Sequence, residues 1–180
     1  MNPYKYDDNL ESERLRTRKL TLEDAVIFSS FFENEEAQKF LPKFFDSAIE
    51  RTKHLIEKQL ERYEENRFGH KAILDKETNE FLGICGLLLQ DVDGTFEIEV
   101  GYHFLPKYWG KGYAPEAAKL FINYAFENNI TDSVISVIDL DNFKSQRVAE
   151  KNGLKIEKQI KYLDDEYVYI YRMKKEDWLF

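Results

Sequence analysis

The sequence predicts an α/β (α+β) fold, in which a mixed sheet carries helices on its faces. Two observations support this expectation: apolar residues recur at helical spacing in four segments, and further segments show the alternation or short apolar runs of strands. With 180 residues, the chain is long enough to bury one core without disulfides or a structural metal. No repeat or long linker divides it, so we expect residues 1–180 to form a single domain.

Near the N-terminus, the pattern predicts a strand followed by a helix. Residues 10–18 alternate loosely between apolar and polar side chains, which indicates the strand. Thr21 precedes Asp24 by three residues, a spacing typical of a helix N-cap, and this predicts a helix over residues 22–34.

A second helix is predicted from Ser47, which has Glu50 three residues later, to about residue 66. Its apolar residues recur at helical spacing through a highly charged segment, so one stripe should face the core and the rest should face water. The link before this helix, residues 40–45, is aromatic and contains Pro42. This link is predicted to be either a core plug or one wall of a substrate pocket.

In the middle of the chain, the recurrence of apolar residues changes from the spacing of a helix to that of a strand. Three successive strands are predicted, over residues 68–74, 81–89 and 96–105. The turns between them, Lys76–Asn79 and Asp91–Gly94, are short. Short turns favour an antiparallel meander.

The C-terminal part alternates between helices and strands. Pro106 ends the third strand of the meander, and Asn152 with Gly153 is typical of a left-handed C-cap that closes a short helix. The predicted elements are, in order, a helix over 114–128, a strand over 134–138, a helix over 144–151, and strands over 154–162 and 167–174 joined at Asp164–Asp165.

Composition and charge disfavour several classes of function. The formal net charge is −8 with both signs mixed along the chain, which disfavours nucleic acid as a partner and makes a cationic substrate electrostatically easier. Cys85 is the single cysteine, so we expect no disulfide framework, and a reducing cytoplasm fits best. No apolar stretch reaches the roughly 20 residues that span a bilayer, and the polar N-terminus does not resemble a signal peptide, so we expect no membrane association.

The stretch Glu99–Ala118 carries the clearest chemical signal, because a strand there passes through a Gly-rich turn directly into a helix. Gly110 and Gly112 allow the backbone to turn tightly with its N–H groups exposed. The first N–H groups of the following helix are unpaired at its positive dipole end, so the turn is predicted to bind a diphosphate. A plain Gly-rich connection is the alternative. Dinucleotide and Walker patterns do not fit, because they would require glycine at Pro115 and at Leu105.

Three groups of residues together resemble a known enzyme family. They are Glu-Val-Gly-Tyr at 99–102, Trp-Gly-Lys-Gly-Tyr-Ala at 109–114, and Asn-x-x-Ser at 142–145 followed by Glu-Lys-Asn-Gly-Leu at 150–154. With Glu-Arg-Leu-Arg-Thr-Arg at 13–18, they are similar to the GNAT superfamily of acetyltransferases, and within it to the RimJ/RimL-like N-acetyltransferases. In the family loop pattern Gln/Arg-x-x-Gly-x-Gly/Ala, Trp109 replaces the polar first residue, which leaves a backbone cradle intact.

The resemblance implies a mostly antiparallel sheet of about seven strands with four helices, splayed between its fourth and fifth strands around acetyl-CoA. Backbone groups of Phe104 and Leu105 would pair with the pantetheine arm, and Asn142 would hold it. Ser145 would reprotonate the departing thiolate, and Lys111 is a candidate for the phosphates. By residue type alone, Asn142 and Ser145 are equally well explained as a helix cap. The remaining loop residues expected to bind the cofactor are Trp109, Gly110, Gly112, Tyr113 and Ala114.

Acyl transfer to an amine needs a proton acceptor, because a primary amine is mostly protonated at pH 7. Glu97 and Glu99 are the candidates, with ordered water as a further possibility. Both alternate with apolar residues, so both carboxylates should project from one face of the strand. Glu99 is preferred because it matches the acidic residue ahead of the family's Gly-Tyr pair, and a solvated strand face is the alternative. The backbone N–H near Phe104 could stabilise the tetrahedral oxyanion.

The remaining candidates for chemistry are weaker. His54, His70 and His103 lack metal spacing, so no metal is expected. We expect an acetyltransferase that moves the acetyl group of acetyl-CoA to an amine by direct attack in a ternary complex, since no cysteine lies near the loop. The acceptor is left open between a protein N-terminus, a polyamine and an aminoglycoside-like amine, and a homodimer is also left open. A non-catalytic CoA-binding sensor or partner module is the alternative function.

Overall fold

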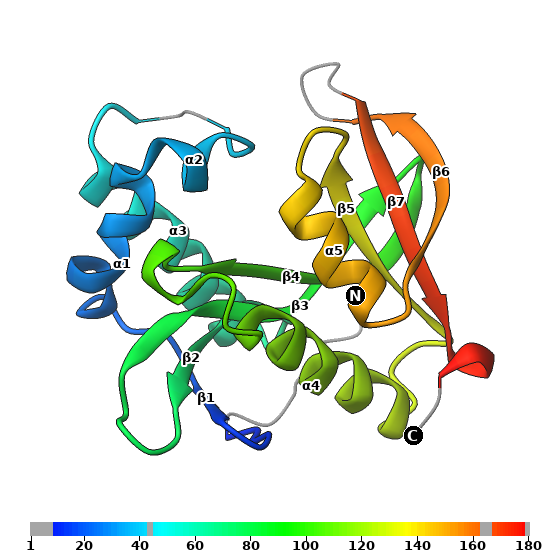
Figure 1. The fold of residues 1–180 in the computed structure, drawn as a ribbon, viewed down its shortest axis with the longest axis horizontal. Coiled ribbons are helices and arrows are strands. Elements are labelled where there is room, and N and C mark those ends of the chain that lie inside the picture. Colours follow the sequence, from blue (N-terminus) through cyan, green and yellow to red (C-terminus); the bar gives the residue numbers. More distant parts are fainter. Residues whose placement is uncertain (1–8, 43–44, 163–166, 179–180) are drawn as a thin grey trace.

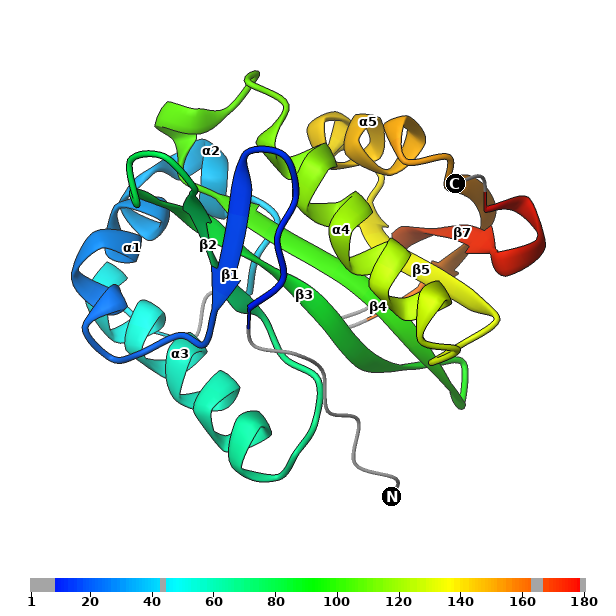
Figure 2. The same ribbon diagram turned by 90° about the horizontal axis from the view of Figure 1, so that it is seen from below.

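The computed structural model describes residues 9–42, 45–162 and 167–178, which form one seven-stranded sheet with helices on both faces (Figure 1 and Figure 2). Across the sheet the strand order is β1-β2-β3-β4-β5-β7-β6, and every neighbouring pair is antiparallel except β4–β5. This confirms the predicted mixed, mostly antiparallel sheet. The strands are β1 (Leu15–Arg18), β2 (Lys71–Asp75), β3 (Phe81–Val92), β4 (Thr95–Phe104), β5 (Ser133–Asp139), β6 (Lys155–Lys161) and β7 (Tyr167–Lys174).

The described residues contain five α-helices, one more than the sequence predicts. They are α1 (Asp24–Glu33), α2 (Glu35–Gln38), α3 (Ala48–Glu64), α4 (Tyr113–Glu127) and α5 (Phe143–Lys151). The additional helix, α2, is a single turn that begins after Asn34, whose Oδ1 accepts the Ala37 N–H at 3.0 Å. One turn is too short to show an apolar period, so the pattern could not reveal it. None of the described helices is long and apolar enough to cross a membrane.

Two predicted boundaries near the N-terminus are wrong. Strand β1 begins at Leu15 instead of residue 10, because the chain turns back on itself there, with the Ser12 N–H donating to the Leu15 carbonyl at 2.9 Å. Helix α1 begins at Asp24, and Thr21 does not cap it. The Asp24 carboxylate instead accepts the Thr21 N–H at 2.9 Å and pairs with Arg18 at 2.7 Å.

Helix α3 begins where the sequence predicts it. Ser47 Oγ accepts the Glu50 N–H at 3.2 Å, which confirms this N-cap. In the link before α3, Leu41 packs against the core, as a plug would, whereas the Phe45 ring is largely exposed and contacts His54. Phe44, which belongs to the same predicted feature, lies outside the described residues, and so does the predicted Asp164–Asp165 turn.

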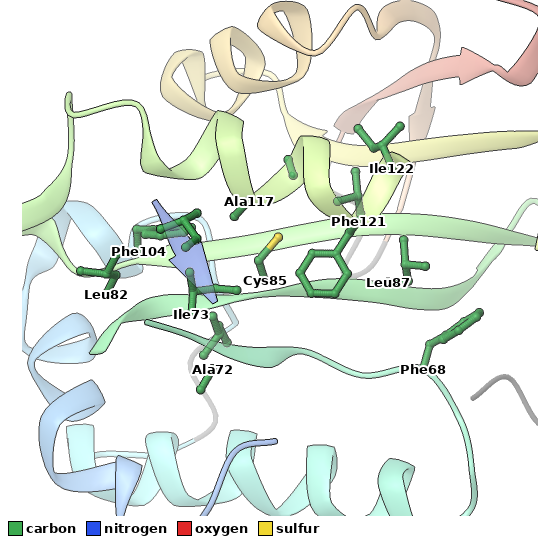
Figure 3. Close-up of a cluster of buried hydrophobic side chains, with 14 of the residues drawn as sticks. Phe68, Ala72, Ile73, Leu82, Cys85, Leu87, Phe104, Ala117, Phe121 and Ile122 are labelled. Carbon is green, nitrogen blue, oxygen red and sulfur yellow. The ribbon is translucent and has the colours of Figure 1, made fainter. Parts of the chain in front are cut away.

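The core lies between the sheet and helices on both of its faces. Helices α1 and α3 cover one face, and α4 with α5 covers the other (Figure 2). On the α4 side, Phe121 and Ile122 pack over β3 near Cys85 and Leu87, as Figure 3 shows, and all four side chains are buried. The apolar face of α4 is therefore the face that packs on the sheet.

The sheet opens between β4 and β5. These strands pair in register only at Glu99 and Ile135, and side chains then replace the backbone ladder. Ser136 Oγ donates to the Val100 carbonyl at 3.0 Å, and the Val137 N–H donates to Glu99 Oε1 at 3.2 Å. The predicted splay between the fourth and fifth strands is confirmed, and Glu99 stands at the point where it begins.

Candidate active site

The turn between β4 and α4 presents its backbone amides outward. Gly110 and Gly112 have φ of 75° and 82°, in the left-handed region that disfavours residues with a Cβ. Within the part of the chain that the structure describes, the N–H groups of residues 110–114 donate no hydrogen bond. The first donor after them is the Glu116 N–H, which bonds to the Gly112 carbonyl at 3.2 Å. A row of unpaired donors therefore lies at the positive end of the α4 dipole, as an anion site requires.

Arg14, on the turn just before β1, braces this loop from behind. Its Nε donates to Glu116 Oε2 at 2.7 Å and its Nη1 donates to the Lys111 carbonyl at 3.1 Å. The guanidinium also lies 4.5 Å from the centre of the Tyr113 ring. Glu116 would otherwise oppose an anion at the start of α4, and the Arg14 charge compensates for it. The sequence reading missed this brace, because Arg14 and Lys111 are 97 residues apart.

Trp109, Phe104 and Leu105 form the inner side of the loop. The Trp109 indole donates to the Phe104 carbonyl at 2.7 Å, and the Leu105 N–H donates to the Leu82 carbonyl of β3 at 3.0 Å. Since main-chain direction alternates along a strand, Leu105 faces β3, and the Phe104 main chain faces the β4–β5 opening. Of the two residues expected to pair with pantetheine, Phe104 has its backbone on the required side. Lys144 lies 4.0 Å above the Trp109 ring, so this indole has a packing role in the absence of the family's polar residue.

Asn142 and Ser145 lie at the start of α5, across the opening from β4. Asn142 Oδ1 accepts the Ser145 N–H at 3.2 Å, so Asn142 caps the helix, as its residue type allows. The Tyr102 hydroxyl donates to the Ser145 carbonyl at 3.0 Å and lies 3.0 Å from Ser145 Oγ. Burial raises the pKa of Tyr102, so this hydroxyl keeps its proton at neutral pH. Tyr102 was missed as a candidate, although it belongs to the Gly-Tyr pair after Glu99.

Glu99 is a buried carboxylate with few partners. Glu99 is 8% exposed, and its carboxylate accepts hydrogen bonds from Gln90 Nε2 at 2.6 Å and from the Val137 N–H at 3.2 Å. Burial raises the pKa of Glu99, and these two hydrogen bonds offset part of that rise. Such a carboxylate binds a proton more readily than one in water, which suits a general base near neutral pH.

Glu97 projects from the same face of β4, as predicted, but has a different environment. The Arg172 guanidinium of β7 binds it through two hydrogen bonds, of 2.8 and 3.0 Å. Hydrogen bonding to Glu97 raises the pKa of Arg172, so the guanidinium keeps its charge. Both carboxylate oxygens of Glu97 are held by this guanidinium, which leaves Glu99 as the candidate without a cationic partner among its hydrogen bonds.

The three histidines are separated into two places. His70 and His103 lie together on the same sheet face as Glu99, with ring centroids 5.5 Å apart, whereas His54 contacts Phe45 beside α3. Among the described residues, no group of three or more His, Cys, Asp or Glu side chains is placed to hold a metal ion.

Comparison with known proteins connects this site with a family. The family model described as an acetyltransferase (GNAT) domain matches residues 14–155. The chain is similar to the uncharacterized protein YkkB of Bacillus subtilis, at 31% identity over 84% of this chain and 88% of that protein. It is 27% identical to the uncharacterized N-acetyltransferase p20 of Bacillus licheniformis over 84% of each chain.

A solved structure has the same fold. RimL, a ribosomal L7/L12 alpha-N-protein acetyltransferase in complex with coenzyme A, superimposes with a TM-score of 0.74 at 16% identity, and the match covers 94% of this chain and 99% of that one. At this identity the likeness concerns the fold alone.

Proposed function

We infer the function from one premise: the chain belongs to the GNAT family of acetyl-CoA-dependent N-acetyltransferases. In this proposal, loop 109–114 binds the cofactor diphosphate, and Glu99 accepts a proton from an attacking primary amine. The observation that carries this proposal is the row of backbone amides at residues 110–114 that have no partner in the described part of the chain. A diphosphate would pair with these donors at the N-terminus of α4. Lys111 and the dipole of α4 would add positive charge there.

In the proposed reaction, the amine attacks the thioester directly. A protonated amine first loses a proton to the Glu99 carboxylate, and its nitrogen lone pair then bonds to the thioester carbonyl carbon. The Phe104 N–H, which faces the opening, would stabilise the oxyanion. When the C–S bond breaks, the thiolate takes a proton from Ser145 Oγ, which lies 3.0 Å from the Tyr102 hydroxyl. The bonded nitrogen loses its second proton as the amide forms, and this proton restores the Ser145 hydroxyl, while Glu99 releases the first proton to solvent.

A covalent acetyl-cysteine is not part of this proposal. Cys85 is fully buried under α4, and burial raises the pKa of its thiol, so little thiolate would exist at neutral pH. An amine that reaches the thioester directly needs no such intermediate. A buried free thiol and the use of acetyl-CoA also support a cytoplasmic location.

The acceptor in this proposal is a primary amine, either a protein N-terminus or a small-molecule amine. The net charge of −8 and the Glu99 carboxylate favour a group that arrives as a cation. RimL, which shares the fold, is named for acetylating the N-terminus of a ribosomal protein, and this supports including protein N-termini.

The loop is tested by the substitution Gly112→Val, with Lys111→Ala as the matched control. At φ of 82°, a branched residue strains the turn, and its Cβ would lie 3.4 Å from Arg14 Nη2, so the substitution would disturb both the orientation of the amides and the Arg14 brace. We expect the Kd for acetyl-CoA, measured by calorimetry, to rise by at least about 100-fold, and Lys111→Ala to weaken binding only a few-fold in a salt-dependent manner. Unchanged affinity in a folded Gly112→Val protein would contradict the assignment of the loop.

The chemistry is tested by release of the CoA thiol. The wild-type protein is assayed with acetyl-CoA against peptides with free N-termini, polyamines and aminoglycosides. Turnover with any of these amines supports the proposal. Binding of acetyl-CoA without turnover of any amine would instead indicate a CoA-binding module.

A further inference from the structure

His70 is a buried residue whose two ring nitrogens have no hydrogen-bond partner among the described residues. It is 6% exposed, and neither Nδ1 nor Nε2 forms a hydrogen bond within the described part of the chain. Only its backbone is bonded, through its N–H to Gln59 Oε1 at 2.9 Å and through its carbonyl to the Tyr63 hydroxyl. Native proteins leave few buried polar groups unsatisfied, so an imidazole in this state indicates a function beyond packing.

The ring occupies a gap on the sheet surface beside Glu99. Glu99, Gly101 and His103 point to the same face of β4, because side chains alternate along a strand. Gly101 is paired with Gly86 of β3, so this row of the sheet has no side chains of its own. A Cβ on Gly101 would lie 2.8 Å from His70 Nε2. The His70 imidazole therefore fills the place of the missing side chain, between Glu99 and His103.

His103 completes a pair with His70. Its ring meets the His70 ring edge-on, with centroids 5.5 Å apart, and meets Phe31 of α1 at 5.5 Å on its other side. His103 is half-buried, and its ring forms no hydrogen bond with the residues that the structure describes. His103 is more exposed than His70, so an acceptor that arrives at Glu99 would meet His103 first.

Both imidazoles are neutral at physiological pH. Burial lowers the pKa of His103 to about 4, and burial, together with the nearby His103 and Arg62, lowers the pKa of His70 well below its usual range. A neutral imidazole offers one N–H donor and one nitrogen acceptor. The same burial, with Arg62 adding positive charge, disfavours a second cation at this place.

We propose that the His70–His103 pair binds a neutral hydrogen-bonding group, a carbonyl or hydroxyl, that lies next to the reacting amine. The pair would thereby select an amine flanked by such a group over an amine flanked by a second ammonium. This inference rests on the proposed acetyl transfer at Glu99 and narrows its acceptor class. It explains why two polar rings remain on a buried face: their nitrogens find their partners when the acceptor binds.

The test compares two acceptors in three proteins. One acceptor is a short peptide with a free N-terminus, and the other is the same peptide with its first carbonyl reduced to methylene, which turns the neighbouring amide into a second amine. The proteins are wild type, His70→Phe and, as a matched control outside the pair, His54→Phe. The kcat/KM for CoA thiol release, the Kd for acetyl-CoA and the melting temperature are measured for each protein.

We expect the wild type and His54→Phe to prefer the intact peptide by at least about tenfold, the value of one good hydrogen bond. His70→Phe should lose most of this preference, mainly through a higher KM for the intact peptide, with an unchanged Kd for acetyl-CoA. Its melting temperature should not fall, since two buried polar atoms without partners are removed. If His70→Phe does not fold, the substitution is made at the half-buried His103 instead. His103→Phe is expected to show the same loss of preference for the intact peptide.

Two results would overturn the proposal. An unchanged preference in folded His70→Phe and His103→Phe, with peptide turnover intact, would contradict the role of the pair and leave the proposed acetyl transfer standing. Failure of the wild-type protein to release thiol with any amine would overturn both proposals together.

Discussion

The two ends of the candidate site are built from different parts of the polypeptide. The cofactor end is main chain: the amides of residues 110–114, exposed by two left-handed glycines and braced by Arg14. The acceptor end is side chain: Glu99 on β4, with His103 on the same strand and His70 inserted from the segment before β2. Backbone donors are the same for every residue type, whereas each acceptor-side group depends on one side chain. Substitutions should therefore affect binding at one end and chemistry or selectivity at the other.

The largest expected effect on the acceptor side comes from Glu99→Gln. Glutamine keeps an oxygen for the Val137 N–H but cannot accept a proton, so kcat should fall by about 10²- to 10⁴-fold. The Kd for acetyl-CoA should stay unchanged, because the loop amides are untouched. Stopped-flow thiol release and calorimetry measure these two quantities. A large loss of acetyl-CoA affinity in this variant would break the separation between the two ends.

The same substitution has a signature in pH dependence. A general base acts when it is deprotonated, and burial raises the pKa of Glu99, so the wild-type rate should fall as the pH drops through this raised pKa. For stability the sign is opposite: the folded state holds this proton more tightly than the unfolded state, so stability decreases as the pH rises through the same window. Glu99→Gln should remove both effects, and its free energy of unfolding at pH 7 should not be lower than that of the wild type.

Glu97→Ala should affect stability more than chemistry, although Glu97 shares a face with Glu99. The Glu97 and Arg172 side chains are only 19% and 15% exposed, and removing Glu97 leaves Arg172 with Glu157 as its remaining ion-pair partner, at 2.9 Å. We expect a loss of about 1–2 kcal/mol in the free energy of unfolding, measured in urea, with kcat reduced less than about threefold. As a control, the double variant Glu97→Leu/Arg172→Met should recover part of this loss. A kcat loss as large as that of Glu99→Gln would make Glu97 the better candidate for the base.

A smaller loss of kcat than in Glu99→Gln is expected at the border of the two ends, in Ser145→Ala and Tyr102→Phe. Because these hydroxyls form one pair 3.0 Å apart, each substitution should lower kcat by about tenfold, and the double variant should lose little more than either single one. Single-turnover thiol release measures this. Fully additive losses would show that the two hydroxyls act separately, and unchanged rates would leave Ser145 as a helix residue only.

The difference between a main-chain end and a side-chain end also explains how much of the site could be predicted from the sequence. The conformation of the glycine loop was predictable because its cause is local: two glycines and a helix start lie within a few residues of each other. The left-handed C-cap at Gly153 was predictable for the same reason, and the structure confirms it with a φ of 84°. The strand and helix pattern was also predictable wherever an element was long enough to show its period.

The acceptor face could not be assembled from the sequence. His70 lies over Gly101, two residues from Glu99, only because β2, β3 and β4 pair side by side, and its spacing from the other histidines predicts no metal site. Glu97 and Glu99 look alike in the pattern, and only Arg172, 75 residues from Glu97, separates an ion-paired carboxylate from a proton acceptor. The predicted cap at Thr21 fails for a different reason, since the Asp24 carboxylate binds the Thr21 N–H and Arg18 together before the helix begins.

The hydrogen bond from the Val137 amide to Glu99 has a consequence for variants that have lost activity. Where β4 and β5 part, this amide would be buried without an acceptor if position 99 became apolar, and folding would suffer along with catalysis. A variant that has lost catalysis should therefore keep the most folding stability when residue 99 is glutamine. An oxygen-bearing side chain at position 99 is needed to hold the β4–β5 opening, even in a protein in which residue 99 accepts no proton.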